Sequence, residues 1–397
     1  MVSREKIAGP PKERLYRNRN LQIVFAVTLV AIMGISPITP AFPKMVKALQ
    51  VPPQSIGLLI TALSLPAAIM APFMGVLADR FGRRKVLVPS LLLFGLAGGA
   101  CALSHNFNVL LMLRVLQGLG AAGLGSINVT IIGDLFSGRQ RAEAMGLNTS
   151  VLSIGAVFYP SIGGAIAVFA WYYPFLLSLA AIPVGLLVLI MLRNPEPRNK
   201  ESLSHYLGGA WKHLKSLKVA GFFAAGIFAF IILFGAYLTY FALFLGEKFH
   251  ASSSIIGLIM SSMSLSAAVA SSQMGRISRR FSEATLIKAA FLIYALALVL
   301  IPPMPNLWLL LVPPAILGIA QGINMPSIMT GVASLAPVEY RGAFMSINST
   351  MMGLGQALGP LVMGLFYVRW GLDAPFFAAA ILAVAASLIA IVAGRKV

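Results

Sequence analysis

The sequence is divided into apolar segments that are each long enough to cross a lipid bilayer. A helix needs about 20 apolar residues to span the hydrocarbon core. We count twelve candidates, at 21–46, 55–76, 85–103, 108–135, 143–169, 172–192, 219–246, 254–275, 284–303, 307–333, 342–368 and 373–394. Only 10% of the residues are charged, against about 25% in an average soluble domain. Because backbone groups in lipid must be hydrogen-bonded internally, we expect an all-α membrane protein with twelve transmembrane helices.

The distribution of basic residues predicts how the chain is oriented. The net charge is +19, which could suggest nucleic acid, but the basic residues lie in short segments between apolar runs. With the N-terminus inside, 25 of the 30 Lys and Arg residues lie on the inner side, and four lie outside. Because inner loops carry the excess of Lys and Arg, we expect a multi-pass protein of the cell membrane with both termini cytoplasmic. Its partner is the lipid bilayer, not nucleic acid, and we expect a monomer.

Several function classes lack the residues they require. Cys101 is the single cysteine, and the four histidines are scattered without ligand spacing, so neither a disulfide framework nor a metal site is expected. The sequence has no G-x-x-x-x-G-K-[ST] loop for ATP. It also has no acid pair within the membrane and no nucleophile triad. We therefore expect no cofactor and no enzymatic activity, and a receptor or enzyme is the least favoured alternative.

The sequence resembles itself after a shift of 200 residues. Segment 55–65 aligns with 255–265, 75–81 with 275–281, and 141–164 with 341–364. This predicts two parallel six-helix bundles, 21–192 and 219–397, preceded by a basic tail, 1–20. Segment 193–218 joins them, either as an amphipathic helix on the inner leaflet or as a solvated linker. Parallel bundles of this kind commonly flank a substrate site near the membrane midplane.

The segment GVLADRFGRRKVL, residues 75–87, resembles the signature of the major facilitator superfamily. An anion at Asp79 could face a helix N-terminus in the other bundle, and Asp134 is a candidate partner for Arg83 or Arg80. The prediction is a cytoplasmic latch between the bundles, formed by Gly75, Asp79, Arg80, Gly82, Arg83 and Asp134. The alternative is a basic loop that only sets topology.

The segment RVLQGLGAAGLG, residues 114–125, contains a G-x-G-x-x-G array that could suggest a dinucleotide. No strand precedes it, so that interpretation fails its context test. It resembles instead a motif in the fourth span of twelve-span drug:proton antiporters within the same superfamily. Arg114 is expected to face a central cavity, since a charge at this depth is costly; the alternative is snorkelling to the outer headgroups.

Residues 146–164 resemble the antiporter motif of the fifth span, through Gly146, Gly155, Pro160, Gly163 and Gly164. In antiporters this motif is associated with export and packs against the second bundle near the outside. Tyr159 stands where the motif has glycine, which weakens the inference to antiport.

These resemblances together imply a secondary transporter that works by alternating access. We predict export of small amphipathic molecules, such as drugs or metabolites, with protons as the expected coupling ion if transport is coupled. No acid lies in the middle of a span, and a buried cation without a counter-ion is costly, so neutral or anionic substrates are favoured. The alternative is a carrier of one anionic metabolite or lipid, anchored by Arg114. The candidate substrate-binding residues are Arg114, Gln117, Asn128, Tyr237, Tyr240, Gln321 and Asn324, although packing would equally explain the two tyrosines.

Overall fold

The computed structural model describes residues 15–192, 216–336 and 341–394. Within these residues, every regular element is helical. Most of the predicted tail 1–20 and nearly all of the amphipathic helix predicted for 193–218 lie outside the described residues.

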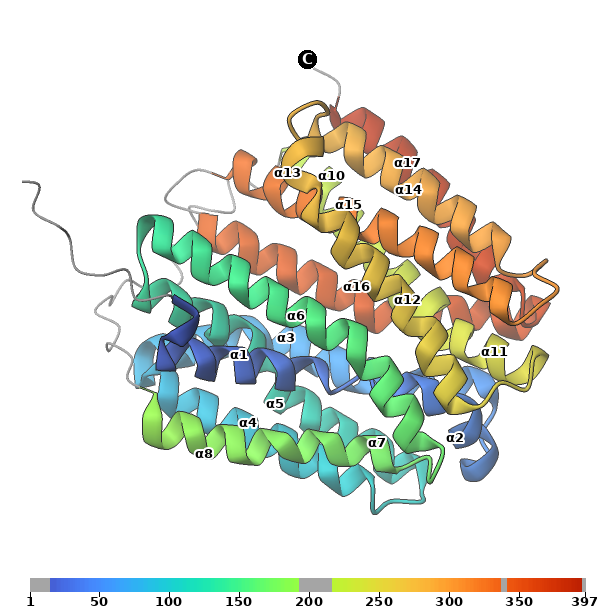
Figure 1. Ribbon diagram of the computed structural model, residues 1–397, viewed down its shortest axis with the longest axis horizontal. Coiled ribbons are helices and arrows are strands. Elements are labelled where there is room, and N and C mark those ends of the chain that lie inside the picture. The colour runs from blue at the N-terminus through green and yellow to red at the C-terminus, as the bar shows by residue number, and fades with distance from the viewer. Residues whose placement is uncertain (1–14, 193–215, 337–340, 395–397) are drawn as a thin grey trace, which may run out of the picture.

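The six spans of the first half pack beside one another (Figure 1). Their buried apolar residues form one cluster of their own and also contribute to a second cluster that is shared with the second half. Helices α3, α4, α5 and α6 are each continuous, whereas the first and sixth spans consist of shorter pieces. The elements are η1 (Leu15–Arg17), α1 (Arg19–Ile32), η2 (Thr39–Ala41), α2 (Phe42–Leu49), η3 (Pro53–Ser55), α3 (Leu58–Phe81), α4 (Arg83–Cys101), α5 (Phe107–Leu135), α6 (Gly138–Ala167), α7 (Tyr173–Leu176), η4 (Leu177–Ala180) and α8 (Ala181–Met191).

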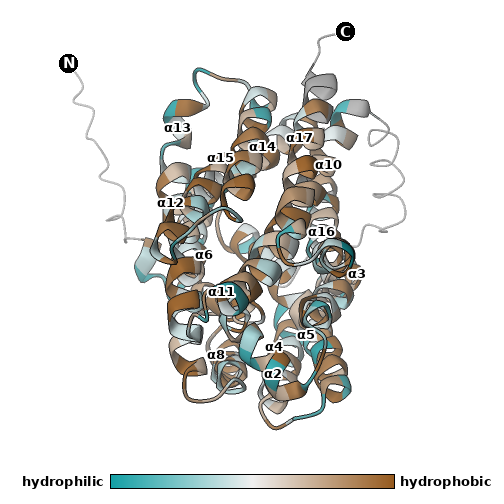
Figure 2. Cartoon of the chain, turned by 90° about the vertical axis from the view of Figure 1, so that its right-hand side faces the viewer, coloured by the Kyte–Doolittle hydropathy of each residue, from teal (hydrophilic) through white to brown (hydrophobic). Residues whose placement is uncertain are grey.

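The second half repeats this arrangement beside the first. Its elements are α10 (Leu217–Ile231), η5 (Ile232–Phe241), α11 (Ala242–Lys248), α12 (Ser253–Ser272), α13 (Met274–Ile277), α14 (Glu283–Leu300), η6 (Trp308–Leu311), α15 (Val312–Leu335), α16 (Arg341–Trp370) and α17 (Ala374–Gly394). Among the described residues, ten helical segments are long and apolar enough to cross a membrane, and Arg19–Ile32 and Ala374–Leu388 are shorter apolar helices. Hydrophobic residues predominate along the helices of both halves (Figure 2).

The first span departs from the continuous helix expected over 21–46. Helix α1 ends at Ile32, and turns lead to η2. Pro37 accounts for this end, because a proline removes one backbone hydrogen bond and its ring clashes with the carbonyl four residues earlier. The carbonyl of Gly34 consequently lies outside a regular helix.

The seventh span contains a feature that nothing in the sequence indicated. Residues Ile232–Phe241 form a π-helix, a rare form that occurs frequently at functional sites. Within it, the Thr239 hydroxyl donates to the carbonyl of Phe234, five residues earlier. The side chains of this segment, Tyr237 and Tyr240 among them, are therefore not spaced around the helix axis as they would be in an α-helix.

Corresponding positions of the two halves share an unusual backbone conformation. Among the described non-glycine residues, only Gln50 and His250 have positive φ, and both have φ of 52°. They are 200 residues apart and each follows the outer helix of an equivalent span, α2 or α11. The backbone thus confirms the register of the sequence repeat.

Candidate transport site

Arg114 lies on α5, inside the first half, and is 1% exposed. Its Nε donates to the Leu59 carbonyl at 3.0 Å, one terminal nitrogen to Gln117 Oε1 at 2.7 Å, and the other to the Gly34 carbonyl at 2.6 Å. Its guanidinium carbon also lies 5.7 Å from the centre of the Phe175 ring. These contacts offset part of the cost of burying an unpaired cation, and they tie the break in the first span to α3 and α5.

This environment matches neither of the two that the sequence suggested for Arg114. The side chain does not reach headgroups, and in this conformation it does not line an accessible cavity. The physical reason is the Gly34 carbonyl, which the break in the first span leaves free to accept a hydrogen bond. Gln117 is fully buried and donates to Ser178 Oγ at 3.0 Å. A substrate-binding role for Arg114 and Gln117 stays a prediction.

The glycines of the G-x-G-x-x-G array serve helix packing in the structure. A Cβ on Gly118 would collide with the Leu63 carbonyl of α3, and one on Gly120 would collide with the backbone of Ser90 and Phe94 in α4. This close approach is what small residues at helix interfaces allow.

A neutral polar network joins the first, fourth and fifth spans. Asn128 Nδ2 donates to Thr28 Oγ1 at 2.5 Å, and Thr28 Oγ1 donates to Asn148 Oδ1 at 2.6 Å. Asn128 is buried, and its Oδ1 has no hydrogen-bond partner. Thr28 and Asn148 were not among the predicted site residues, and the direct hydrogen bond of Thr28 to both asparagines could not be predicted from one sequence.

The second half also contains a group of polar side chains between two spans, on α14 and α15. The Tyr294 hydroxyl donates to Gln321 Oε1. Asn324, on the same helix as Gln321, is fully buried, and neither of its amide atoms is hydrogen-bonded. Gln117 and Gln321 occupy equivalent places in the repeat, and each binds a neighbouring helix. Of the predicted site residues, Asn128 and Asn324 are those with unused amide atoms in this conformation.

The two tyrosines predicted on the seventh span are both buried. Tyr237 is 2% exposed and donates to the Met260 carbonyl at 2.7 Å. Tyr240 is fully buried, stacks on Tyr367 with ring centres 5.3 Å apart, and leaves its hydroxyl unpaired. Packing explains their positions here, and cavity lining stays a prediction for another conformation.

The predicted latch residues interact within the first half. Arg83 forms an ion pair with Asp79, and its Nε lies 3.1 Å from Asp134 Oδ2. Asp134 thus contacts Arg83, one of the two partners that the sequence suggested. The Asp79 side chain is 52% exposed, and a Cβ on Gly75 would meet no atom within 4 Å. Gly82, another of the predicted latch residues, has φ of 100° at the turn between α3 and α4. The latch between the two halves is therefore not engaged in this conformation, and its closure stays a prediction.

The antiporter-type motif on α6 divides its contacts between two partners. Gly155 packs against Leu29 and Ile32, and Gly163 against the Pro37 carbonyl, all in the first span. Tyr159 is buried, and its ring lies against Gly155. The Pro160 carbonyl contacts Gly257 of α12, and Gly164 contacts Ser253 at the start of α12, both in the second half. Only the latter part of the motif therefore packs against the second half; Gly146 has open space around it.

Two equivalent interfaces seal the halves at one end. A Cβ on Gly57 would lie 2.7 Å from the Pro360 ring, and one on Gly257 would collide with the Pro160 carbonyl. The Thr61 hydroxyl donates to the Ala357 carbonyl at 2.7 Å, and the Ser161 and Ser261 hydroxyls are 2.7 Å apart. Gly57 and Gly257, Pro160 and Pro360, and Thr61 and Ser261 are each 200 positions apart, so the sequence repeat relates the two interfaces. The hydrogen-bond partners of Thr61 and Ser261 are not related in this way.

The opposite end of the same helices lacks this seal. A Cβ on Gly75 of α3 or Gly146 of α6 would meet nothing within 4 Å, and the same holds for Gly275 of α13, the short helix that follows α12. If the basic loops face the cytoplasm, as the charge distribution predicts, this is the inward-facing conformation.

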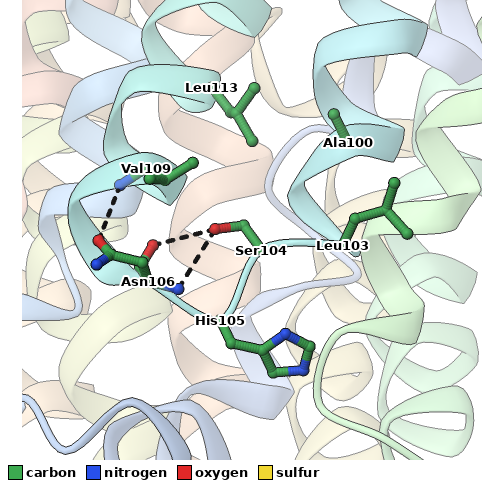
Figure 3. Close-up of a pocket in the computed structure, with 7 residues that line it drawn as sticks. All are labelled: Ala100, Leu103, Ser104, His105, Asn106, Val109 and Leu113. Atoms are coloured by element: carbon green, nitrogen blue, oxygen red, sulfur yellow. Dashed lines mark hydrogen bonds between the residues drawn. The ribbon is translucent and has the colours of Figure 1, made fainter.

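A shallow pocket of about 650 Å³ lies between α4 and α5 at the sealed end (Figure 3). Its lining is Ala100, Leu103, Ser104, His105, Asn106, Val109 and Leu113. Ser104 and Asn106 hydrogen-bond each other, and the Asn106 side chain caps α5 through the Asn108 and Val109 amides. Because the polar groups of Ser104 and Asn106 already hydrogen-bond within the loop, we interpret the pocket as part of the loop surface and not as a substrate site.

The family model described as "Major Facilitator Superfamily" matches residues 24–246 and 224–396. The chain belongs to the major facilitator superfamily. It is therefore a membrane transporter and not an enzyme.

Curated relatives extend over most of the chain. Multidrug resistance protein 2 of Bacillus subtilis (strain 168) is 27% identical over 358 residues, which cover 87% of this chain and 88% of that protein. Quinolone resistance protein NorA of Staphylococcus aureus (strain COL) is 26% identical over 368 residues, 91% of this chain and 93% of that protein. Resistance transporters are thus among its relatives.

Solved structures share the fold at lower sequence identity. A bacterial homolog of the human lysosomal transporter Spinster aligns with a TM-score of 0.82 and 18% identity, over 98% of each chain. The nucleoside transporter NupG aligns with a TM-score of 0.80 and 17% identity, over 95% of this chain and all of that one. These likenesses support the major facilitator fold.

Proposed function

We propose that the protein exports small amphipathic organic molecules, neutral or anionic, from the cytoplasm by alternating access. The observation that carries this proposal is the pair of equivalent interfaces, Gly57 with Pro360 and Gly257 with Pro160, which seal one end of the molecule. The same helices are unsealed at the other end. A substrate path that is closed on one side and open on the other is what an alternating-access carrier requires.

The substrate charge follows from where the acids lie. Asp79 and Asp134 are at the unsealed end and both face Arg83. Glu247 lies at the sealed end. The fixed charge buried deepest in the first half is the Arg114 guanidinium. A lipophilic cation would meet no free counter-ion there, and burying it would be costly.

The amides of Asn128 and Asn324 are the groups that we propose for hydrogen bonding to the substrate. One belongs to each half, and both retain unused polar atoms. The alternative of an anion anchored by Arg114 is less well supported, because three of its five N–H donors already bind protein oxygens.

The test is uptake into inverted membrane vesicles under an imposed pH gradient. A neutral amphiphile and an anionic one should accumulate, and a permanent cation such as tetraphenylphosphonium should not. Vesicles that lack the protein are the control for uptake that does not depend on it. Robust accumulation of the permanent cation that survives Asp134→Asn would reject the proposed charge preference.

A further inference from the structure

Helices α6 and α12 join the two halves at the sealed end and diverge towards the unsealed end (Figure 1). The Ser161 and Ser261 hydroxyls, which are 2.7 Å apart, define the register of this contact. The two helices run in opposite directions, because α6 approaches the sealed end and α12 leaves it. Equal steps along the two helices, away from this contact, therefore reach positions that face one another once the helices come together.

Eighteen residues from this contact, one helix carries an acid and the other chain segment carries a base. The step leads from Ser161 to Glu143 on α6, and from Ser261 to Arg279 just after α13. Eighteen residues are five turns of an α-helix, so each charge lies close to the face that carries the serine contact. The chain keeps this phase between α12 and α13, because Gln273 stays in the αR region with φ of −89° and ψ of −4°.

The same step in the other interface leads to a residue of the predicted latch. Thr61 of α3 bonds the second half at the sealed end, and Asp79 follows it by eighteen residues on the same helix. Asp79 and Arg279 are 200 residues apart, so the second half places a base where the first half places an acid. The acid that faces Arg279 across the halves is then Glu143.

Both side chains are free of ion pairs in this conformation. Glu143 and Arg279 are exposed. The two ion pairs found among the described residues are both made by Arg83, inside the first half. A pair between Glu143 and Arg279 would therefore not have to break an existing one.

The neighbouring charges make the sign of this pair significant. The Arg141 guanidinium lies beside Gly133 of α5, and Arg276 donates to Gln273 Oε1 at 3.0 Å. The other charged residues of these helix ends are Arg139, Arg280 and Glu283. Because bases outnumber acids on both sides, closure of the unsealed end brings like charges together unless an acid faces one of them.

We propose that Glu143 and Arg279 form an ion pair between the halves when the unsealed end closes. The pair stabilises the conformation that is open at the sealed end, because the pair exists only in that conformation. It gives the second half a latch of its own, in which a base stands at the position equivalent to Asp79. The inference rests on the alternating access proposed above, but not on the substrate or on the direction of transport.

The expected effect is moderate, because both side chains are exposed to solvent. An exposed ion pair shifts an equilibrium by about two- to five-fold, so loss of this pair should lower the ratio of closed to open unsealed ends by that factor. High salt should reduce the difference between variants, since ions screen exposed charges.

The experiment measures closure of the unsealed end without any substrate. Spin labels at Phe81→Cys and Phe281→Cys, in a Cys101→Ala background, report the distance between equivalent exposed positions of the two halves in lipid nanodiscs. Glu143→Gln should lower the short-distance population about two- to five-fold, and Arg279→Gln should lower it equally. Glu143→Arg combined with Arg279→Glu should restore the population that each exchange alone reduces.

Arg280→Glu is the matched control, because Arg280 is an exposed arginine one position further along the chain. Arg279→Glu and Arg280→Glu change the net charge equally, and an effect of net charge alone would favour closure in both. The proposed pair predicts that Arg279→Glu opens the unsealed end and that Arg280→Glu does not. Equal effects of the two variants, or a full effect of Arg279→Glu in a Glu143→Gln protein, would overturn the proposal.

A second measurement tests the contact itself. In a Gly57→Leu and Cys101→Ala background, which should hold the sealed end open, Glu143→Cys and Arg279→Cys should cross-link through a short bifunctional methanethiosulfonate. Absence of this cross-link, while the labels at positions 81 and 281 report a closed end, also overturns the proposal. A Gly57→Leu protein whose unsealed end never closes would contradict the alternating access on which the pair depends. Loss of vesicle transport with an intact distance response would count against the proposed export alone.

Discussion

Arg114 illustrates how a buried charge can be a structural element of a transporter. Its three acceptors belong to α3, to α5 and to the broken segment of the first span. Arginine spreads its donors over a planar fork, and lysine concentrates them at one point. A lysine at this position could not reach the Leu59 and Gly34 carbonyls together.

We therefore expect Arg114→Lys to lower the free energy of unfolding. A buried carbonyl left without a donor costs about 1–3 kcal/mol, so the thermal midpoint in detergent should fall clearly. Transport of neutral and anionic substrates should fall together. The control is Arg84→Lys, an exposed site, where a change within about 0.5 kcal/mol is ordinary. Selective loss of anion transport with unchanged stability would instead identify Arg114 as a substrate anchor.

Asn324 presents the opposite case, because its amide makes no hydrogen bond in the described structure. Replacing an unsatisfied polar group by an apolar one removes a penalty and loses no bond. Asn324→Ala should therefore leave stability within about 1 kcal/mol of wild type, while raising the KM for a neutral substrate. The matched variant is Ser178→Ala, which removes the hydrogen bond from Gln117 and should lower stability. An unchanged KM in Asn324→Ala would exclude this amide from the substrate site.

At the scale of helices, glycines between the two halves distinguish the sealed end from the unsealed end. Gly57 packs against Pro360, whereas Gly75, at the other end of the same helix, has open space around it. Gly57→Leu should hold the outer ends apart, and Gly257→Leu should do the same by the equivalence of the halves. Both variants should lose transport. In a Cys101→Ala background, spin labels at Leu103→Cys and Pro303→Cys, which are exposed in equivalent loops of the two halves, should show long distances.

Gly75→Leu is the control for that prediction. It should fold normally and show the short outer distance, yet also lose transport, because the bulky side chain obstructs closure of the inner end. Normal transport by Gly57→Leu would mean that the seal at Pro360 does not have to form during the cycle.

The elements that the sequence predicted best are those with regular apolar patterns. Spans two to five were expected within a few residues of α3, α4, α5 and α6. The break after Ile32 is explained by Pro37, but a proline within a membrane helix does not always end it, so the pattern alone could not place the break. The π-helix of the seventh span has no composition signal, since its residues are as apolar as those around them.

Contacts between distant helices were harder to predict than the helices themselves. The 200-residue repeat placed Gly57 and Gly257, and Pro160 and Pro360, at equivalent positions. It could not show that each glycine packs against the proline of the opposite half, because that depends on which conformation the bundles adopt. Likewise, the sequence predicted that Arg114 faces a cavity or reaches the outer headgroups. It could not show that the side chain is buried in the first half, because two of its acceptors are backbone carbonyls, which are present at every residue and carry no sequence signal.

For the molecule as a whole, the direction of transport depends on which end faces the cytoplasm. Basic loops at the unsealed end predict that this end is inside, because Lys and Arg are retained on the cytoplasmic side. In a Cys101→Ala background, a membrane-impermeant maleimide should label Leu103→Cys in intact cells, since Leu103 is 82% exposed at the sealed end. Ser278→Cys, exposed between α13 and α14, should react only after permeabilisation. The reverse labelling pattern would mean that the protein has the opposite orientation in the membrane. Glu247 and the sealed end would then face the cytoplasm, and Asp79 would lie outside. The same structure would then be outward-facing.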